Sequence, residues 1–323
     1  MRRRRYLKSP GNFAGLTVAG ALILTVLTPA GIVLATTAHT STAHTTTAHT
    51  TAHTGTAHAR TVRASSGPSG VSAPEAAIAN ARTGAILWSR ELNTQRPIAS
   101  ITKVMTALVV LRSGGLNNTL TIPRSVIAYV NEYGASSAGL HPGDRLTVRQ
   151  LLSAMVLPSG ADAAYTLAQA YGPGISAFVA KMNATAWALG MTRTHFTNFD
   201  GLPYPYRTAD YSTAADLIKL GRAAMSWAAF RTVAAERSYH LPAGSGHHAY
   251  TWYSTNPLLG HYPGAMGIKT GWTPYSGHCL LFEVSRGSVM LIGVNLDSPG
   301  KGTTVNGVDA TRMLNWAFSQ LKA

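Results

Sequence analysis

Length, composition and charge set the first limits on this 323-residue chain. Hydrophobic residues make up 46% of it, enough for one large or two small domains with a real core, which excludes a chain that is disordered throughout. Its formal net charge of +15 favours anionic cell-surface polymers or lipid headgroups over nucleic acid as neighbours, although simple solubility explains the charge equally well. The single cysteine, Cys279, excludes an intrachain disulfide and, far from the N-terminus, a lipoprotein anchor.

Residues 1 to 37 have the pattern of an export signal or a membrane anchor. Arginine at positions 2 to 5 precedes an uncharged, largely apolar stretch over residues 11 to 37. This stretch approaches the roughly 20 residues that span a bilayer but is interrupted at Pro29, so cleavage and anchoring both remain open. The basic start also resembles a twin-arginine signal, with general secretion as the alternative. We expect an exported protein at the outer face of the cytoplasmic membrane or in the cell wall, with a membrane tether through this segment as one option.

Residues 38 to 73 are expected to form a disordered linker. Between positions 36 and 60 the sequence repeats threonine, alanine and histidine and has no apolar residue larger than alanine. Burial therefore cannot offset the entropy of ordering this stretch. The regular histidines raise the alternative of a metal site, but no acidic residue or cysteine accompanies them, which favours a solvated, glycosylated or bare spacer.

From residue 74 to residue 323 the pattern is that of a folded domain. Short apolar runs at residues 76–79 and 85–88, joined by a turn that contains Gly84, predict a β-hairpin. The stretch from Ser100 to about residue 230 is mostly helical in pattern. Within it, the sequence contains a capping box and a long amphipathic helix, marked by Thr147 with Gln150 and by apolar residues from Phe178 to Leu189 before Gly190.

The C-terminal part returns to strands and ends in a helix. Strand patterns cover residues 268–273, 278–285 and 288–296, and an amphipathic helix follows over residues 309–321. Early strands, a helical middle, late strands and a closing helix predict an α+β fold. In this fold the N- and C-terminal segments form one antiparallel sheet flanked by helices, an α-helical subdomain is inserted between them, and a cleft separates the two lobes.

A Ser-x-x-Lys pattern at Ser100 and Lys103 is the first candidate for chemistry. The chain contains two more such patterns, at residues 298–301 and 319–322, but a Pro-Gly turn lies inside one and the frayed C-terminus contains the other. Only Ser100 opens an apolar helical run. Residues three apart on a helix are neighbours, so the Lys103 amine can reach the Ser100 hydroxyl.

Four downstream segments accompany this pattern: Lys269-Thr270-Gly271, His195 to Asn198, Gly201-Leu202 and Tyr211 to Ala214. With Ser100 and Lys103 they resemble a known family, the low-molecular-mass penicillin-binding proteins or serine D-alanyl-D-alanine carboxypeptidases of the β-lactamase-like superfamily. The resemblance covers roughly residues 74 to 321 and implies a β-lactamase/transpeptidase-like fold.

The sequence departs from the family pattern at the second motif, Ser-x-Asn. The matching loop keeps Ser159 but carries Ala161 in place of the asparagine, whose amide in relatives holds the substrate's peptide carbonyl. One orienting hydrogen bond is therefore missing. Asp162 is a candidate substitute, but relatives that keep the asparagine often have an aspartate there too.

The resemblance also implies a mechanism. Ser100 attacks the carbonyl between two terminal D-alanines, and Lys103 takes its proton, because burial and a nearby second cation disfavour a charged lysine. Ser159 relays a proton to the departing amine. Contacts to the terminal carboxylate are assigned to Lys269, Thr270 and Thr273.

The family resemblance implies that the backbone amides of Ser100 and Trp272 stabilise the tetrahedral intermediate. Gly271 lacks a side chain, so the strand edge can approach the substrate. Peptidoglycan stem peptides are the expected substrate and β-lactams the expected inhibitors, with no nucleic acid as a partner. Neither a metal nor an organic cofactor is implied.

Several alternatives remain. Singly, each of these residues has a structural explanation, such as a helix cap for Ser100 or an edge-strand charge for Lys269. A DD-endopeptidase acting on cross-links would use the same three motifs, and Ala161 motivates a catalytically weak peptidoglycan-binding scaffold. A class A β-lactamase also needs a deacylating carboxylate, and the only glutamate between the second and third motifs is Glu236.

The histidines raise a last alternative, a metal site or a Ser-His-Asp triad. Candidate members are His195 with Asp200, and His247 with His248. The chain has no Gly-x-Ser-x-Gly and no His-Glu-x-x-His motif, which disfavours both interpretations.

Overall fold

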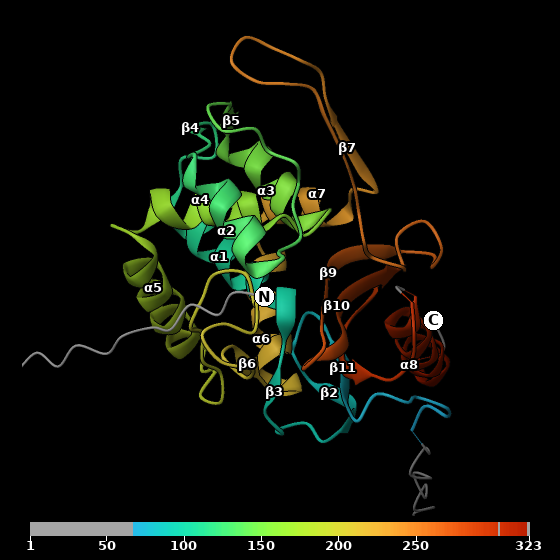
Figure 1. Ribbon diagram of the computed structural model, residues 1–323. Coiled ribbons are helices and arrows are strands. Elements are labelled where there is room, and N and C mark those ends of the chain that lie inside the picture. The colour runs from blue at the N-terminus through green and yellow to red at the C-terminus, as the bar shows by residue number, and fades with distance from the viewer. Residues whose placement is uncertain (1–66, 303, 322–323) are drawn as a thin grey trace, which may run out of the picture. The chain divides into compact units, whose positions relative to one another are not determined.

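A five-stranded antiparallel sheet organises the part of the chain that the computed structural model describes, residues 67–302 and 304–321 (Figure 1). The strand order β2-β1-β11-β10-β9 pairs the first two strands with the last three. The predicted sheet of N- and C-terminal segments is therefore confirmed, and the expected leader and most of the expected linker lie outside the described residues. The strands are β1 (Glu75–Asn80), β2 (Ile86–Arg90), β9 (Ala265–Thr273), β10 (Gly277–Arg286) and β11 (Val289–Ser298).

Helices fill the chain between β2 and β9, as predicted. The capping box before α3 is present, with Gln150 N–H donating to Thr147 Oγ1 over 3.2 Å and Thr147 N–H donating to Gln150 Oε1 over 2.7 Å. None of the helices within the described residues has the length and apolar character needed to span a bilayer. The helices are η1 (Ala99–Ile101, 3-10), α1 (Thr102–Ser113), α2 (Ser125–Tyr133), α3 (Val148–Val156), α4 (Ala161–Tyr171), α5 (Ile175–Ala188), α6 (Ala214–Met225) and α7 (Ala228–Ala235).

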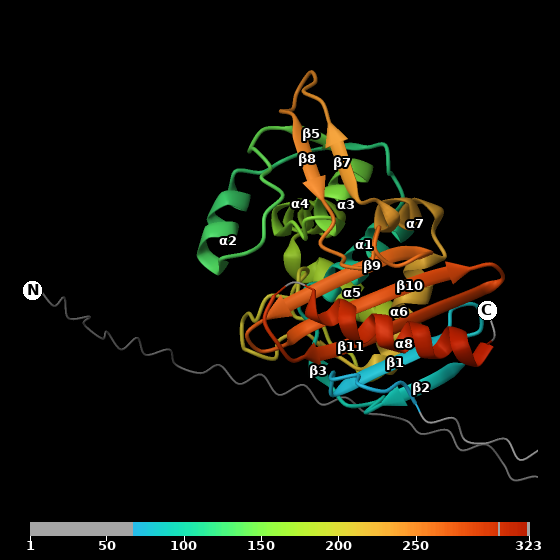
Figure 2. The same ribbon diagram turned by 90° about the vertical axis from the view of Figure 1, so that its right-hand side faces the viewer.

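Three short antiparallel ribbons, which the sequence analysis did not predict, connect these helices. The longest of them projects from the helical lobe as a hairpin (Figures 1 and 2). The ribbons pair β3 (Arg96–Pro97) with β6 (Tyr211–Ser212), β4 (Thr119–Thr121) with β5 (Arg145–Thr147), and β7 (Ser238–Leu241) with β8 (Tyr250–Tyr253).

The two faces of the central sheet contribute to two separate cores. Because successive side chains of a strand point to opposite faces, Leu281 on β10 packs toward the helical lobe while Leu280 and Phe282 pack toward α8 (Val305–Leu321). Figure 2 shows α8 lying across its face of the sheet. The closing helix begins at Val305, four residues earlier than predicted, and the sheet is buried on both sides.

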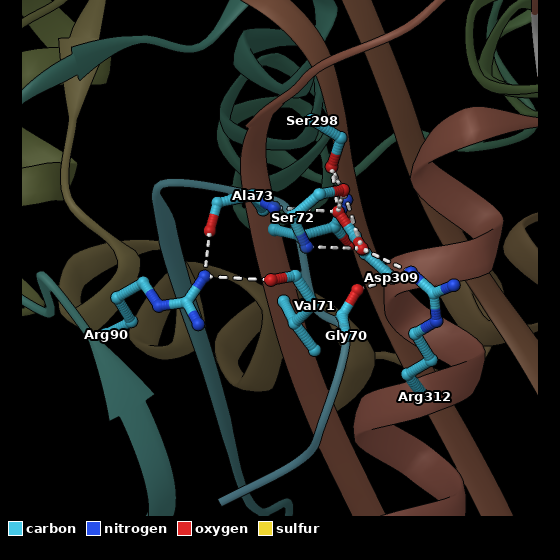
Figure 3. Close-up of polar contacts among 9 residues, drawn as sticks. Gly70, Val71, Ser72, Ala73, Arg90, Ser298, Asp309 and Arg312 are labelled. Carbon is cyan, nitrogen blue, oxygen red and sulfur yellow. Dashed lines mark hydrogen bonds and ion pairs between the residues drawn. The ribbon is translucent and has the colours of Figure 1, made fainter.

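The segment just before β1 corrects the expected linker boundary at residue 73. Val71 and Ala73 are buried, and the backbone amides of Ser72 and Ala73 donate to the Asp309 carboxylate on α8 over 2.8 and 2.9 Å (Figure 3). Arg90 donates to the carbonyl oxygens of Val71 and Ala73. These contacts come from residues far away in the sequence, so local composition could not predict them.

Candidate active site

The predicted Ser100 and Lys103 lie within hydrogen-bond distance of each other. Ser100 is part of the 3-10 helix η1 rather than of α1, which begins only at Thr102. The i, i+3 relation persists across this junction, so Lys103 Nζ lies 2.9 Å from Ser100 Oγ. Ala99, directly before the serine, has a left-handed φ of 47°, a strained conformation for a residue with a side chain.

The Lys103 amine is buried, and three carboxylates act on its charge. Its side chain is only 1% exposed, and Nζ also donates to the carbonyl oxygen of Asp200 over 3.0 Å. Burial lowers the pKa of Lys103, and the negative charges of Asp200, Asp162 and Asp210 oppose that shift. The amine is therefore easier to deprotonate than an exposed lysine but is not isolated from negative charge.

The second predicted lysine, Lys269 on β9, shares this buried environment. It is 1% exposed, and Nζ donates to the carbonyl oxygen of Thr270 over 3.0 Å. Burial and the charge of Lys103 hold the pKa of Lys269 well below its usual range. The two amines thus lie near enough to disfavour a state in which both are protonated.

Gly271 brings strand β9 against the turn that contains the serine. A Cβ atom placed on Gly271 would lie 2.8 Å from the Ile98 carbonyl oxygen and 3.1 Å from the backbone nitrogen of Ser100. No side chain fits there without displacing the turn. Strand β9 at Gly271 therefore packs directly against the backbone of the turn that contains Ser100.

These residues open onto a cleft of about 520 Å³ between the helical lobe and the sheet. Ser159, which has a left-handed φ of 66°, lines it from the helical side and is 8% exposed. The residues lining the cleft are Ser100, Ser136, Pro158, Ser159, Thr255, Thr270, Gly271, Trp272, His278, Gly300, Lys301, Gly302 and Asn306.

The cleft includes residues that the sequence analysis did not single out. Thr255 lies beside the predicted Thr270, with their hydroxyl oxygens 2.6 Å apart. Lys301, from a Ser-x-x-Lys pattern that the sequence analysis set aside, also lines the cleft. Its spacing from Ser298 does not pair the two side chains as on a helix, because Lys301 reaches the cleft from the loop between β11 and α8.

Two predicted substrate contacts, Lys269 and Thr273, are absent from the cleft lining, Lys269 because its amine is buried and Thr273 because its hydroxyl bonds elsewhere. The Thr273 hydroxyl accepts from the backbone N–H of Ser276 over 3.0 Å and donates to the Ser276 Oγ over 2.9 Å. The side chain is 7% exposed and, at the end of β9, bonds the turn that leads to β10. Alternation along β9 explains this, since Thr270 and Trp272 point to the face opposite to that of Thr273.

Comparison with known proteins agrees with this geometry. A family model described as D-alanyl-D-alanine carboxypeptidase matches residues 60–300, about three quarters of the sequence. The chain belongs to the D-alanyl-D-alanine carboxypeptidase family. The enzyme class and fold that the sequence resemblance implied are confirmed.

Relatives and solved structures of this family cover most of the chain. The D-alanyl-D-alanine carboxypeptidase of Streptomyces sp. strain K15 is 40% identical over 252 residues, which span 74% of this chain and 85% of the relative. The D-alanyl-D-alanine endopeptidase of Pseudomonas aeruginosa is 34% identical over 245 residues, 75% of this chain and 81% of that protein. The crystal structure of the Streptomyces K15 DD-transpeptidase is similar with a TM-score of 0.73 and 38% identity, covering 79% of this chain and all of that chain.

The family's missing asparagine is not replaced by its neighbour. Ala161 is 1% exposed, and its N–H donates to the Ser136 carbonyl oxygen over 2.7 Å. The Asp162 carboxylate accepts from the amides of Ala138 and Leu140 and from the Ser137 hydroxyl. Asp162 is therefore committed to holding the loop before it and does not offer a group to a substrate.

The alternatives based on histidine or a deacylating glutamate find no support in the site. His195 pairs through its backbone with Tyr211, and His248, in the loop between β7 and β8, has its Nδ1 2.9 Å from Asp144. Glu236 lies near Ser153 and does not line the cleft. Within residues 67–302 and 304–321, no group of three or more His, Cys, Asp or Glu side chains could hold a metal ion.

Proposed function

We propose that this chain cleaves the bond between the two terminal D-alanines of peptidoglycan stem peptides through an acyl-enzyme on Ser100, and that β-lactams acylate the same serine. The observation that carries this proposal is the 2.9 Å contact between Ser100 Oγ, which lines the cleft, and the buried Lys103 Nζ. A serine hydroxyl needs a neighbouring base to become a nucleophile, and the Lys103 amine is the base within reach.

The proton moves along that contact. In the ammonium form Lys103 Nζ donates to the serine oxygen. In the neutral form the same separation allows Ser100 O–H to donate to the nitrogen lone pair. Attack forms the bond from Oγ to the carbonyl carbon while the proton passes to Nζ. The lowered pKa of Lys103, caused by burial, makes the neutral form easier to reach than in an exposed lysine.

A bound substrate's terminal carboxylate favours a charged Lys269 and a neutral Lys103. Thr255 and Thr270 offer hydroxyl groups on the sheet side of the cleft, and Lys301 offers positive charge in its lining. The Lys269 amine is buried and bonds the Thr270 carbonyl oxygen. A bound carboxylate would stabilise the protonated form of Lys269. That charge in turn disfavours protonation of Lys103, so the base is most active when a substrate with a free C-terminus is in place.

The amides of Ser100 and Trp272 bind the oxyanion of the tetrahedral intermediate, and Ser159 passes a proton to the departing D-alanine nitrogen. Loss of one such amide contact typically lowers the rate by about two to three orders of magnitude. Water then hydrolyses the acyl-enzyme, which makes the reaction a carboxypeptidase reaction. The endopeptidase relative from Pseudomonas motivates the second candidate, cleavage of cross-links with the same residues.

Acylation by a labelled penicillin tests the nucleophile. The purified protein should form a stable covalent adduct, Ser100→Ala should form none, and Ser136→Ala, a matched change elsewhere in the cleft, should keep labelling. Equal labelling of the wild type and Ser100→Ala would remove Ser100 as the nucleophile. Penicillin labelling without release of D-alanine from a D-Ala-D-Ala peptide, and without cleavage of cross-linked muropeptides, would instead indicate a binding protein.

We also propose export to the cell envelope, on the basis of the basic and apolar pattern of residues 1 to 37. Fractionation of cells that express the full chain should recover it outside the cytoplasm. Residence in the membrane fraction after an alkaline wash would indicate a tether, and release would indicate a cleaved signal. Retention in the cytoplasm would contradict the proposal.

A further inference from the structure

The loop from Asn198 to Leu202 packs against the base from the side opposite the cleft. Its Asp200 carbonyl oxygen accepts from Lys103 Nζ over 3.0 Å. A Cβ atom on Gly201 would lie 1.9 Å from the Ala99 carbonyl oxygen, so this loop touches the turn that contains the nucleophile. Asn198 Oδ1 accepts from the N–H groups of Asp200 and Gly201 and holds the loop in a tight turn.

The Asp200 side chain connects this loop to helix α2. It is fully buried, and Oδ2 accepts a hydrogen bond from Tyr129 Oη over 2.9 Å while Oδ1 accepts from the Leu202 N–H over 3.3 Å. The Tyr129 ring packs against Phe199 and Tyr165, with centroid distances of 5.2 Å to each. Burial raises the pKa of the Asp200 carboxyl, and the positive charge of Lys103 and the hydrogen bond from Tyr129 oppose that shift.

We infer that Tyr129 and Asp200 are positioning residues for the reaction. The Asp200 backbone orients the Lys103 amine toward Ser100, and the Asp200 carboxylate, held by Tyr129, sets the pH at which that amine becomes a base. This inference rests on the proposed role of Lys103. It extends the site beyond the three motifs to α2, a helix that contributes no residue to the cleft lining.

Other charged groups also face Lys103 and remain the same in the variants used below. They are Asp210 from the segment before β6, Asp162 from α4 and Lys269 from β9. Burial raises the pKa of Asp210 to about 7, so it contributes its own titration to the wild type and to the variants alike. Asp200 differs from Asp210 because its carbonyl oxygen accepts directly from the reacting amine, whereas Asp210 bonds Thr102 and Thr197.

Removal of the Asp200 charge should shift the pH profile of the acylation rate constant, so that the fall in rate on the acid side (the acid limb) occurs at lower pH. In Asp200→Asn the ammonium form of Lys103 loses a stabilising charge, its pKa falls, and the neutral amine persists at lower pH. An opposite charge at short range typically shifts a pKa by one unit or more, so we expect a displacement of about one unit. Because the two groups are coupled, the limb reports the pair rather than Lys103 alone.

Tyr129→Phe keeps the ring but removes the donor to Asp200. The carboxylate then protonates at a higher pH and its effect on Lys103 weakens, so the limb should move in the same direction by a smaller amount. Tyr165→Phe is the matched control, because its ring packs in the same cluster while its hydroxyl contacts only the Ser125 hydroxyl and the Gln169 amide. The acid limb of the Tyr165→Phe profile should coincide with that of the wild type.

The measurement is the second-order rate constant for acylation by a labelled penicillin as a function of pH, with the melting temperature of each variant. A purely structural role would lower the rate at every pH and leave the limb in place, which would overturn the inference. Equal displacement by Tyr165→Phe would also overturn it. If Asp200→Asn does not fold, Tyr129→Phe decides alone. Absence of labelling in the wild type would instead contradict the proposed function.

Discussion

Replacement of Gly271 by alanine should separate the contribution of the strand edge from that of the nucleophile itself. The added Cβ would lie 2.8 Å from the Ile98 carbonyl oxygen and 3.1 Å from both Ala99 Cβ and Ser100 N. Backbone atoms cannot rotate away as a side chain can, so β9 and the nucleophile turn must move apart by a few tenths of an ångström. This displacement misaligns the amides of Ser100 and Trp272, the two proposed oxyanion donors.

The expected magnitudes follow from that displacement. Loss of one aligned donor should lower the acylation rate constant by about 10²- to 10³-fold. Overpacking of a rigid contact should lower the free energy of unfolding by about 1 to 3 kcal/mol, which for a domain of this size is roughly 2 to 12 °C in melting temperature. Labelled penicillin and a thermal melt measure the two effects.

Gly244→Ala is the matched control, because Gly244 is exposed and its Cβ would meet only the half-buried His247 ring at the tip of the β7–β8 hairpin. That ring can turn aside, so rate and melting temperature should stay near those of the wild type. If Gly271→Ala acylates at the wild-type rate, the close approach of β9 to Ser100 has no catalytic consequence and the assignment of the oxyanion site is wrong.

Three further predictions concern substitutions at buried positions. Lys269→Met should abolish peptide turnover yet raise the free energy of unfolding by about 1 to 3 kcal/mol at neutral pH. Because the folded pKa of Lys269 is lowered, that gain should shrink as the pH rises toward the unfolded lysine value of about 10.4, and a gain independent of pH in thermal melts would refute the assignment. Asp309→Ala should lower the free energy of unfolding by roughly 3 kcal/mol, since the buried Asp309 carboxylate accepts hydrogen bonds from Ser72, Ala73 and Ser298. It should also expose the segment around Ser72 to limited proteolysis. Unchanged cleavage kinetics would show that other contacts hold this segment. Ala161→Asn should restore one amide contact and raise kcat/KM for a D-Ala-D-Ala peptide about 3- to 10-fold, and no change would mean that another group already holds the substrate carbonyl.

The predictions from sequence succeeded where a local pattern decides the structure. The β1–β2 hairpin depends on two short apolar runs around a turn that contains a glycine, and the start of α3 depends on Thr147 and Gln150, three positions apart. The Ser100 and Lys103 pair also depends on local spacing, which survives the change from 3-10 to α-helix. In each case the interacting groups are separated by a few residues, so backbone geometry fixes their relation before any tertiary packing.

The sequence by itself determined the α+β class, the family and the catalytic candidates, because hydrophobic period and motif spacing are properties of neighbouring residues. Only the tertiary structure decided that Thr273 lies in a turn, that Asp162 is occupied by the loop before it, and that Lys301 reaches the cleft. It also decided that Asp200 lies beside Lys103, from a position 97 residues away in the chain. These relations depend on which face of a strand or helix meets which neighbour, and that choice is made by burial of the whole core rather than by any short stretch of sequence.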